Sequence, residues 1–157
     1  MLECVILVGI PAAGKTTFHR RHFASTHRHI SKDLLPNAAG RDTRQRRLVD
    51  EALAAGVSIV VDNTNATRAE RHAIIAAARA RGARVIGYYF DVTTREAVAR
   101  NAGRTGREAV PKVAIFTVAK RLEPPAADEG FDQLFRLHLK SDRTFEIVEV
   151  DSTPNGR

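Results

Sequence analysis

Short apolar runs alternate along the chain with longer amphipathic stretches. Each apolar run ends at glycine or polar residues, as buried strands do, and these runs predict strands at residues 3–8, 29–31, 57–61, 84–90, 133–139 and 144–150. The amphipathic stretches, with their caps and terminating glycines or prolines, predict helices at residues 15–24, 40–55, 67–81, 94–102 and 111–122. Strands that alternate with helices predict an α/β fold with a mainly parallel central sheet flanked by helices.

Length and composition favour one such domain. The chain has 157 residues, of which 43% are apolar, enough for a substantial core and typical of a globular protein. We expect a single domain over residues 1–151 and a frayed tail at 152–157. Cys4, the only cysteine, is expected to pack in the first strand, and it excludes an intrachain disulfide or a cysteine-based zinc cluster.

The charge balance and the apolar pattern bear on partners and location. Lys and Arg total 25 against 18 Asp and Glu, a net charge of +7 that favours polyanionic partners such as nucleic acid. The chain shows no signal-peptide pattern and no apolar stretch near the roughly 20 residues of a membrane span. We therefore expect a cytoplasmic protein without a membrane partner.

A phosphate-binding loop follows the first strand. Gly9-Ile-Pro-Ala-Ala-Gly-Lys15-Thr16 fits the pattern G-x-x-x-x-G-K-[ST], and it lies between a predicted strand and a predicted helix, as that motif requires. The glycines permit a tight turn whose N–H groups face phosphate oxygens, and the helix adds its positive end. Lys15 is suited to the β- and γ-phosphates and Thr16 to Mg²⁺. The motif predicts a P-loop NTPase fold and a nucleoside triphosphate ligand.

Polar residues that close the other strands are expected at the same sheet edge, where ligands bind in such folds. They are Asp33, residues 62–65 and Asp91. Asp33 is predicted to activate an acceptor hydroxyl, with a helix cap or turn as the alternative. Asp62 is predicted to hold Mg²⁺ or its waters, with a turn carboxylate as the alternative.

Basic residues supply two further hypotheses. Arg104 and Arg107 lie in a glycine-flanked segment that predicts a mobile lid whose arginine reaches the phosphates; a solvated loop is the alternative. Four histidines lie close together in the sequence, at positions 19, 22, 27 and 29. Because basic neighbours oppose metal binding and no acidic or cysteine ligands accompany them, we expect a solvated basic face there.

The ordered motifs resemble the 5′-hydroxyl polynucleotide kinases, over about residues 4–137. This family includes a phage end-healing enzyme, the kinase domain of the animal repair kinase-phosphatase and kinase modules of bacterial RNA-repair proteins. The matching motifs are Gly9-x-Pro-x-x-Gly-Lys-Thr-Thr17, Ser31-Lys-Asp33, Val61-Asp-Asn-Thr-Asn65, Arg100-Asn-x-x-Arg104, Ala109-Val-Pro111, Lys120-x-x-Glu-x-Pro125 and Glu129-Gly-Phe131.

The resemblance implies a function for each matching position. It implies an adenylate-kinase-like phosphotransferase, with the first strand central and a short lid, that moves the ATP γ-phosphate to a nucleic-acid 5′-OH with Mg²⁺. Catalysis would fall to Lys15, Asp33 as base and Arg104. The donor-binding residues would be Gly9, Ala12, Ala13, Gly14, Lys15, Thr16, Thr17 and Arg104. The acceptor-binding residues would be Asp33, Asp62, Asn63, Thr64, Asn65 and Arg100. Asp62 is thus assigned both to the acceptor and, with Thr16, to the metal.

The chain also departs from the family. Where the phage enzyme has an arginine three residues beyond the base, which grips the acceptor phosphate, this chain has Pro36; Arg41 or Arg44 offers a replacement charge. The D-x-D-x-T motif of the associated phosphatases is absent, so a stand-alone kinase is implied. Two other functions stay open: a kinase of a small-molecule hydroxyl, and a nucleotide-regulated binding module, although the guanine motif N-K-x-D is absent.

Overall fold

The computed structural model describes residues 1–35, 39–104 and 109–150. Pro36, Arg107 and the tail predicted at 152–157 lie outside these ranges. The strands are β1 (Glu3–Val8), β2 (Arg28–Ile30), β3 (Ile59–Asp62), β4 (Arg84–Asp91), β5 (Gln133–Leu139) and β6 (Phe145–Glu149). The helices are α1 (Lys15–His22), α2 (Arg41–Ala54), α3 (Arg68–Ala80), α4 (Thr94–Ala102) and α5 (Lys112–Arg121), with short 3₁₀ turns η1 (Lys32–Leu34) and η3 (Ala127–Glu129).

The strands form one sheet in the order β2-β3-β1-β4-β5-β6. Every neighbouring pair is parallel except β5 and β6, which are antiparallel. The predicted α/β fold with a mainly parallel sheet is therefore confirmed, and β1 lies inside the sheet between β3 and β4. Burial on both faces explains the continuous apolar sequence of β1, because helices cover each side of a parallel sheet.

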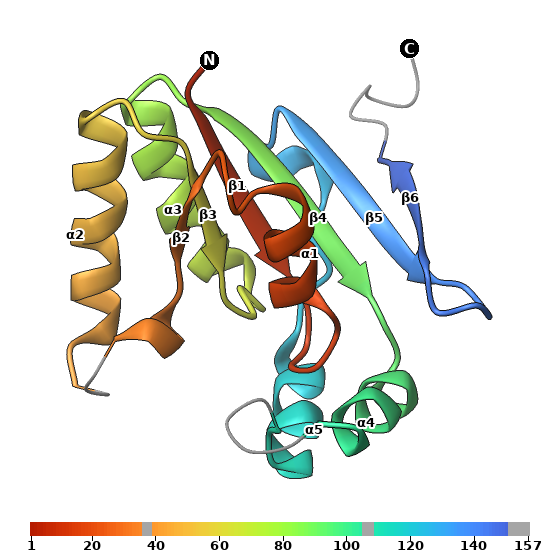
Figure 1. Cartoon of the computed structure of the whole chain (residues 1–157). Helices are drawn as coiled ribbons and strands as arrows, with labels where there is room; N and C mark the ends of the chain where they lie inside the picture. Colours follow the sequence, from red (N-terminus) through yellow and green to blue (C-terminus); the bar gives the residue numbers. More distant parts are fainter. Residues whose placement is uncertain (36–38, 105–108, 151–157) are drawn as a thin grey trace.

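Two apolar clusters hold the helices against the sheet. Side chains of α2 and α3 pack on one face, where Ile6, Val61 and Ile75 are buried. Phe18 of α1 and Ile115 of α5 are buried on the other face with Leu7. Figure 1 shows α1 in front of the central strands, α2 and α3 toward the β2 side, and α4 and α5 below the ends of the strands. No helix in the described ranges has the length and apolar character needed to span a membrane.

Local chemistry sets the element boundaries. The Thr67 hydroxyl accepts a hydrogen bond from the Glu70 N–H and caps α3, as the sequence predicts. β3 begins two residues later than predicted because the Val57 N–H donates to the Ala52 carbonyl, 2.9 Å away, and closes the end of α2. Gly56, with φ 76°, makes this reversal possible. Val57 is consequently 39% exposed and outside the sheet.

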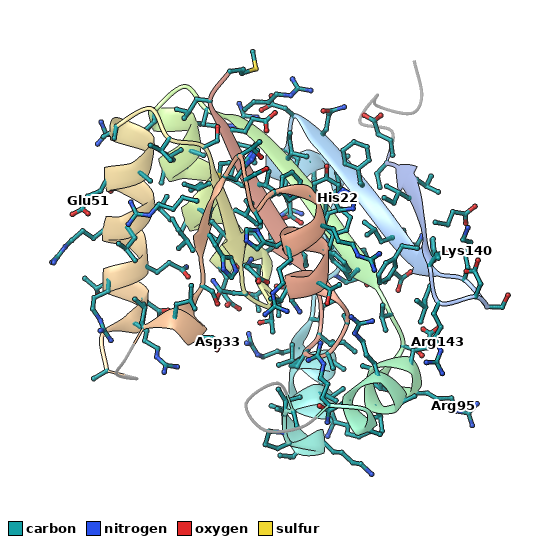
Figure 2. All side chains as sticks on the ribbon, viewed as in Figure 1. His22, Asp33, Glu51, Arg95, Lys140 and Arg143 are labelled. Carbon is teal, nitrogen blue, oxygen red and sulfur yellow. The ribbon has the colours of Figure 1, made fainter. Side chains whose placement is uncertain are left out.

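Parallel strand direction places the ends of β1, β3 and β4 at one edge of the sheet, where α1, η1 and α4 also begin or end (Figure 1). Figure 2 shows Asp33 projecting from η1 at this same edge. The fold therefore brings together the sequence segments that contain the predicted phosphate, metal and acceptor residues.

Candidate active site

The phosphate loop connects β1 to α1 over residues 9–16. Gly14 precedes α1 with φ 105°, in the left-handed region that favours glycine. A Cβ atom added to Gly14 would lie only 3.1 Å from the ring of Phe145, which belongs to β6. Ala12 also has a positive φ, 65°. The backbone conformation therefore requires glycine at position 14, and the ring of Phe145 leaves little room for a side chain there.

The Lys15 side chain folds back over this loop. Its Nζ donates to the carbonyl oxygens of Gly9 at 2.8 Å and Ile10 at 2.7 Å. The Gly9 N–H in turn donates to the Thr64 carbonyl at 3.0 Å, which ties the loop to the segment after β3. The ammonium group is thus held within the loop by backbone oxygens.

Lys15 is also the most strongly perturbed cation of the site. Only 8% of the residue is exposed, and burial lowers the pKa of its ammonium from 10.5 to about 8. Asp62 and Asp33 act in the opposite direction and raise this pKa, whereas Arg104 lowers it. Lys15 therefore interacts electrostatically with the metal, acceptor and lid positions predicted from the sequence.

Asp62, the last residue of β3, is 5% exposed and accepts two hydrogen bonds on one oxygen. Thr16 Oγ1 lies 2.9 Å and His29 Nε2 2.8 Å from Asp62 Oδ2. Burial acts to raise the pKa of Asp62, but the bonds from His29 and Thr16 and the charge of Lys15 outweigh it and lower the pKa. Asp62 is therefore a carboxylate at neutral pH.

The chemistry of Thr16 and Asp62 suits a magnesium ion. Both side chains offer oxygen ligands, and the carboxylate supplies the negative charge that this hard cation prefers. Within residues 1–35, 39–104 and 109–150, no hydrogen bond occupies Asp62 Oδ1, so one carboxylate oxygen remains for an ion or its waters. The donor set is thus consistent with the predicted magnesium position.

Asp33 lies in the middle of η1 and is exposed. The cap of this turn is Ser31, whose side chain accepts from the Asp33 N–H at 3.2 Å. No hydrogen bond engages the Asp33 carboxylate within the described residues. Leu34, beside it, is 62% exposed. The carboxylate is therefore not used as the cap of η1, and it lines the cavity described below.

Asn63 connects η1 to α2. Its Oδ1 accepts from the Lys32 N–H at 2.9 Å, and its Nδ2 donates to Gln45 Oε1 at 2.6 Å. Gln45 is buried in α2 with 8% exposure. These hydrogen bonds fix the position of η1, and therefore the position of Asp33, the predicted base.

Asn65 has a different environment from the rest of its motif. It is 3% exposed, has φ 45°, and donates from Nδ2 to the Leu7 carbonyl at 2.7 Å and the Val61 carbonyl at 3.3 Å. Its own carbonyl accepts from Arg71 Nη1 at 2.9 Å. The side-chain amide of Asn65 therefore joins β1 to β3 through these two hydrogen bonds.

Arginines from and after α4 line the other side of the loop. Arg100 Nη2 donates to Thr17 Oγ1 at 3.1 Å, and partial burial, then Arg104 and Arg21, lower the Arg100 pKa. Asn101 exchanges two hydrogen bonds with Val110: its Nδ2 donates at 2.7 Å and its Oδ1 accepts at 2.9 Å. This pair joins the two ends of the predicted lid.

These groups surround one cavity of about 830 Å³. Of the residues predicted from the sequence, those in its lining are Ala12, Ala13, Gly14, Lys15, Thr16, Thr17, Asp33, Asp62, Asn63, Thr64, Arg100 and Arg104. Gly9 and Asn65 are outside the lining and act through the backbone contacts described above. Asp91 is also outside it: the carboxylate pairs with Arg136 and lies 3.8 Å from His138 on the sheet surface.

The expectation of a solvated basic face is wrong for three of the four histidines, His19, His27 and His29. His19 is 5% exposed and stacks on His29, with ring centroids 4.0 Å apart. Both line the cavity, whereas His22 is exposed and His27 pairs with Glu3. No local signal reveals this, because His29 reaches Asp62 only when β2 pairs with β3.

Comparison with solved structures identifies the fold. Kti12 of Chaetomium thermophilum, in complex with ADP-AlF3, has a TM-score of 0.65 at 17% identity, over 89% of this chain and 92% of that one. A sugar kinase from Janibacter sp. HTCC2649 has a TM-score of 0.63 at 18% identity, over 87% and 86%. A fungal RNA kinase has a TM-score of 0.63 at 17% identity, over 88% and 38%. The chain therefore has the fold of the P-loop kinases.

Sequence comparison gives a family. Transcription factor bHLH140 of Arabidopsis thaliana is 27% identical over 167 residues, which cover 97% of this chain but only 18% of that protein. The profile of the AAA_33 family, described as an AAA domain, matches residues 4–125 and thus most of the chain. The chain therefore belongs to the AAA_33 family of AAA domains.

Proposed function

We propose that this protein transfers the γ-phosphate of ATP to the 5′-hydroxyl end of DNA or RNA in a Mg²⁺-dependent reaction. The observation that supports this best is the arrangement around the cavity. The Asp33 carboxylate is exposed and has no hydrogen-bond partner among the described residues, and it lines the same cavity as the phosphate-loop cation, Lys15, and the arginines Arg100 and Arg104. The cavity thus offers a base for an acceptor and cations for a phosphoryl group.

The phosphate loop would bind ATP, the phosphoryl donor. Lys15 would exchange its bonds to the Gly9 and Ile10 carbonyls for bonds to phosphate oxygens, which carry full negative charge. Thr16 and Asp62 would hold the magnesium ion, which neutralises charge on the phosphates when it is bound. The remaining residues of the loop, with Thr17, would supply backbone and hydroxyl donors.

On the acceptor side, Asp33 would act as the general base. Its carboxylate takes the proton of the 5′-hydroxyl as that oxygen attacks the γ-phosphorus. The bond between the γ-phosphorus and the β–γ bridging oxygen breaks, and ADP leaves with those electrons. Asn63 and Thr64, which line the cavity between Asp33 and the loop, would position the acceptor.

Positive charge would stabilise the phosphoryl group during transfer. Arg104 lowers the pKa of both Lys15 and Arg100, so its guanidinium lies close enough to repel each of these two cations. Such repulsion raises the energy of the empty site and is relieved when phosphate charge arrives between the cations. Arg104 is therefore the proposed transition-state arginine and Arg100 its basic neighbour on the acceptor side.

Two features favour a nucleic-acid acceptor. The chain has a net charge of +7, which suits a polyanion. Leu34, 62% exposed in the cavity beside Asp33, offers an apolar surface to a nucleoside rather than hydroxyl-binding groups to a sugar. The fungal RNA kinase among the structural neighbours is consistent with this choice.

A second candidate is a kinase of a small-molecule hydroxyl. The observation that favours it is size: the sugar kinase from Janibacter matches over 86% of its own length, whereas the RNA kinase matches over 38%. A base in the position of Asp33 would serve either acceptor, so the acceptor itself must be tested.

The test is an assay with γ-labelled ATP and three sets of acceptors. These are oligonucleotides of DNA or RNA with a 5′-OH, the same oligonucleotides with a 5′-phosphate, and a panel of sugars and nucleosides. We expect label only on the 5′-OH ends, and its loss by at least about a hundredfold in Asp33→Asn, with ATP affinity retained. Label on a sugar would select the second candidate. Full activity of Asp33→Asn would remove the base assignment.

A further inference from the structure

His29 lies against the carboxylate to which the proposed function assigns magnesium, although no motif in the sequence includes this histidine. Its Nε2 is 2.8 Å from Asp62 Oδ2, and Thr16 Oγ1 is 2.9 Å from the same oxygen. We propose that His29 is a positioning residue that fixes the orientation of the Asp62 carboxylate toward the cavity. This inference rests on the proposed function only for the assignment of magnesium to Thr16 and Asp62.

The pairing of β2 with β3 places the histidine. His29 is opposite Val60 and Ile30 is opposite Val61 in a parallel register. Side chains alternate along a strand, so Asp62 lies on the same face as Val60, which packs on the side of α1. His29 is therefore a diagonal neighbour of Asp62 on that face, within reach of a long side chain.

His19 supports the ring of His29 from α1. The two imidazoles stack with centroids 4.0 Å apart and an interplanar angle of 17°. His19 is 5% exposed, and its Nδ1 is buried without a hydrogen-bond partner among the described residues. Its contribution to this contact is therefore packing. The stack limits rotation of the His29 ring and holds Nε2 toward Asp62.

Two donors on one oxygen determine how the carboxylate faces the cavity. With Oδ2 bound by Thr16 and His29, Asp62 keeps Oδ1 for the metal or its waters. Without His29, the remaining donor would be the Thr16 hydroxyl, which rotates and is itself a proposed metal ligand. Partners that orient a metal ligand typically change metal affinity by about 10- to 100-fold.

The experiment measures ADP binding by calorimetry with Mg²⁺ and with EDTA, so it requires neither acceptor nor turnover. His29→Phe keeps a ring for His19 but has no donor, and His29→Asn keeps polarity but is too short to reach Asp62. His29→Gln restores a donor near the position of Nε2. Asp62→Asn is the control for the metal assignment, and thermal melting checks that each variant is folded.

We expect the tightening of ADP binding by Mg²⁺ to fall about tenfold or more in His29→Phe and His29→Asn, with the affinity in EDTA unchanged. In His29→Gln the tightening of ADP binding by Mg²⁺ should stay within about threefold of wild type. If the Phe and Asn variants keep the full Mg²⁺ effect while Asp62→Asn loses it, the positioning inference is overturned and the proposed function stands. If Asp62→Asn also keeps it, the metal assignment fails, and the inference fails with it.

Discussion

Arg71 and Glu129 form a two-point ion pair inside the protein and join α3 to η3. Arg71 Nε lies 2.7 Å from Glu129 Oε1, and Nη2 lies 2.9 Å from Oε2. The side chains are 0% and 3% exposed. Since Nη1 also donates to the Asn65 carbonyl, the guanidinium holds the segment after β3 against the segment before β5.

Arg71→Met is expected to destabilise the protein by about 3–5 kcal/mol, because it leaves the Glu129 charge buried without its partner. Urea unfolding measures this change. Arg79→Met is the matched control on the same helix: its side chain is 51% exposed near Asp132, so a loss of less than about 1 kcal/mol is expected. The double variant Arg71→Met/Glu129→Leu should recover part of the loss. Equal losses for Arg71→Met and Arg79→Met would contradict the structural importance of the pair.

The buried pair illustrates what the sequence alone does not predict. The period of α3 and its Thr67 cap indicate the helix correctly, and the apolar run at 84–90 indicates β4, because both signals are local. Nothing local shows that Arg71 is buried or that His29 meets Asp62. Both contacts join residues more than 30 positions apart, so they depend on which elements pack together.

The candidate site likewise has features that the sequence predicts and features that it does not. The phosphate loop is recognisable because its chemistry depends on consecutive residues, and the edge to which Asp33, Asp62 and Asn63 belong follows from parallel strand direction. The contacts that each side chain makes cannot be predicted from these signals. Asn65 belongs to the same motif as Asn63, yet its left-handed backbone, with φ 45°, turns the amide toward β1 instead of the cavity.

The depressed pKa of Lys15 predicts a specific dependence of stability on pH. Below about pH 8 the lysine is protonated in both the folded and unfolded states, and the full cost of burying the charge is present. Between pH 8 and 10.5 the unfolded chain binds a proton that the folded protein lacks, so the free energy of unfolding rises with pH. The shift corresponds to about 3 kcal/mol. Lys15→Met should therefore be more stable than wild type at pH 7 by up to about this amount, and should lose ATP binding.

Urea unfolding at pH 7 and at pH 10.5 tests this prediction as a difference between wild type and Lys15→Met. The difference is needed because burial raises the pKa of Cys4 to about 12, which lowers stability above pH 9 in both proteins. The control is Lys112→Met, at the exposed start of α5: its stability relative to wild type should be the same at pH 7 and at pH 10.5. A stability gain of Lys15→Met that stays constant across this pH range would contradict the depressed pKa.

The position of Arg104 predicts a selective loss of turnover. If its guanidinium stabilises charge that develops during transfer, Arg104→Ala should lower kcat about a hundredfold or more, with the Kd for ATP changed by less than about threefold. Arg95→Ala is the control, because Arg95 is exposed on α4 and projects away from the cavity (Figure 2). Single-turnover kinetics and calorimetry measure the two quantities. A parallel loss in kcat and ATP affinity would instead indicate ordinary ground-state binding.

Arg41 and Arg44 are the two arginines proposed to contact an acceptor phosphate, in place of the arginine that the chain lacks at Pro36, and Arg44 is substituted first. Arg44 lies in the first turn of α2 and donates from Nη2 to the Ala39 carbonyl at 3.1 Å, which holds the guanidinium beside the residues that precede α2. Arg44→Ala should weaken binding of a 5′-OH oligonucleotide regardless of its sequence.

The salt dependence separates a phosphate contact at Arg44 from general attraction to a basic protein. Each phosphate contact on a single strand contributes about −0.7 to the slope of log K against log salt, so Arg44→Ala should make this slope shallower by about 0.7. Arg81→Ala removes the same charge at the far end of α3, where the helix meets the opposite edge of the sheet (Figure 1), and should leave the slope unchanged. Fluorescence anisotropy from 50 to about 300 mM salt measures both. Equal slopes for the two variants would mean that Arg44 adds only net charge, and Arg41, whose Nη2 donates to the Leu35 carbonyl at 3.3 Å, would be the residue to substitute next.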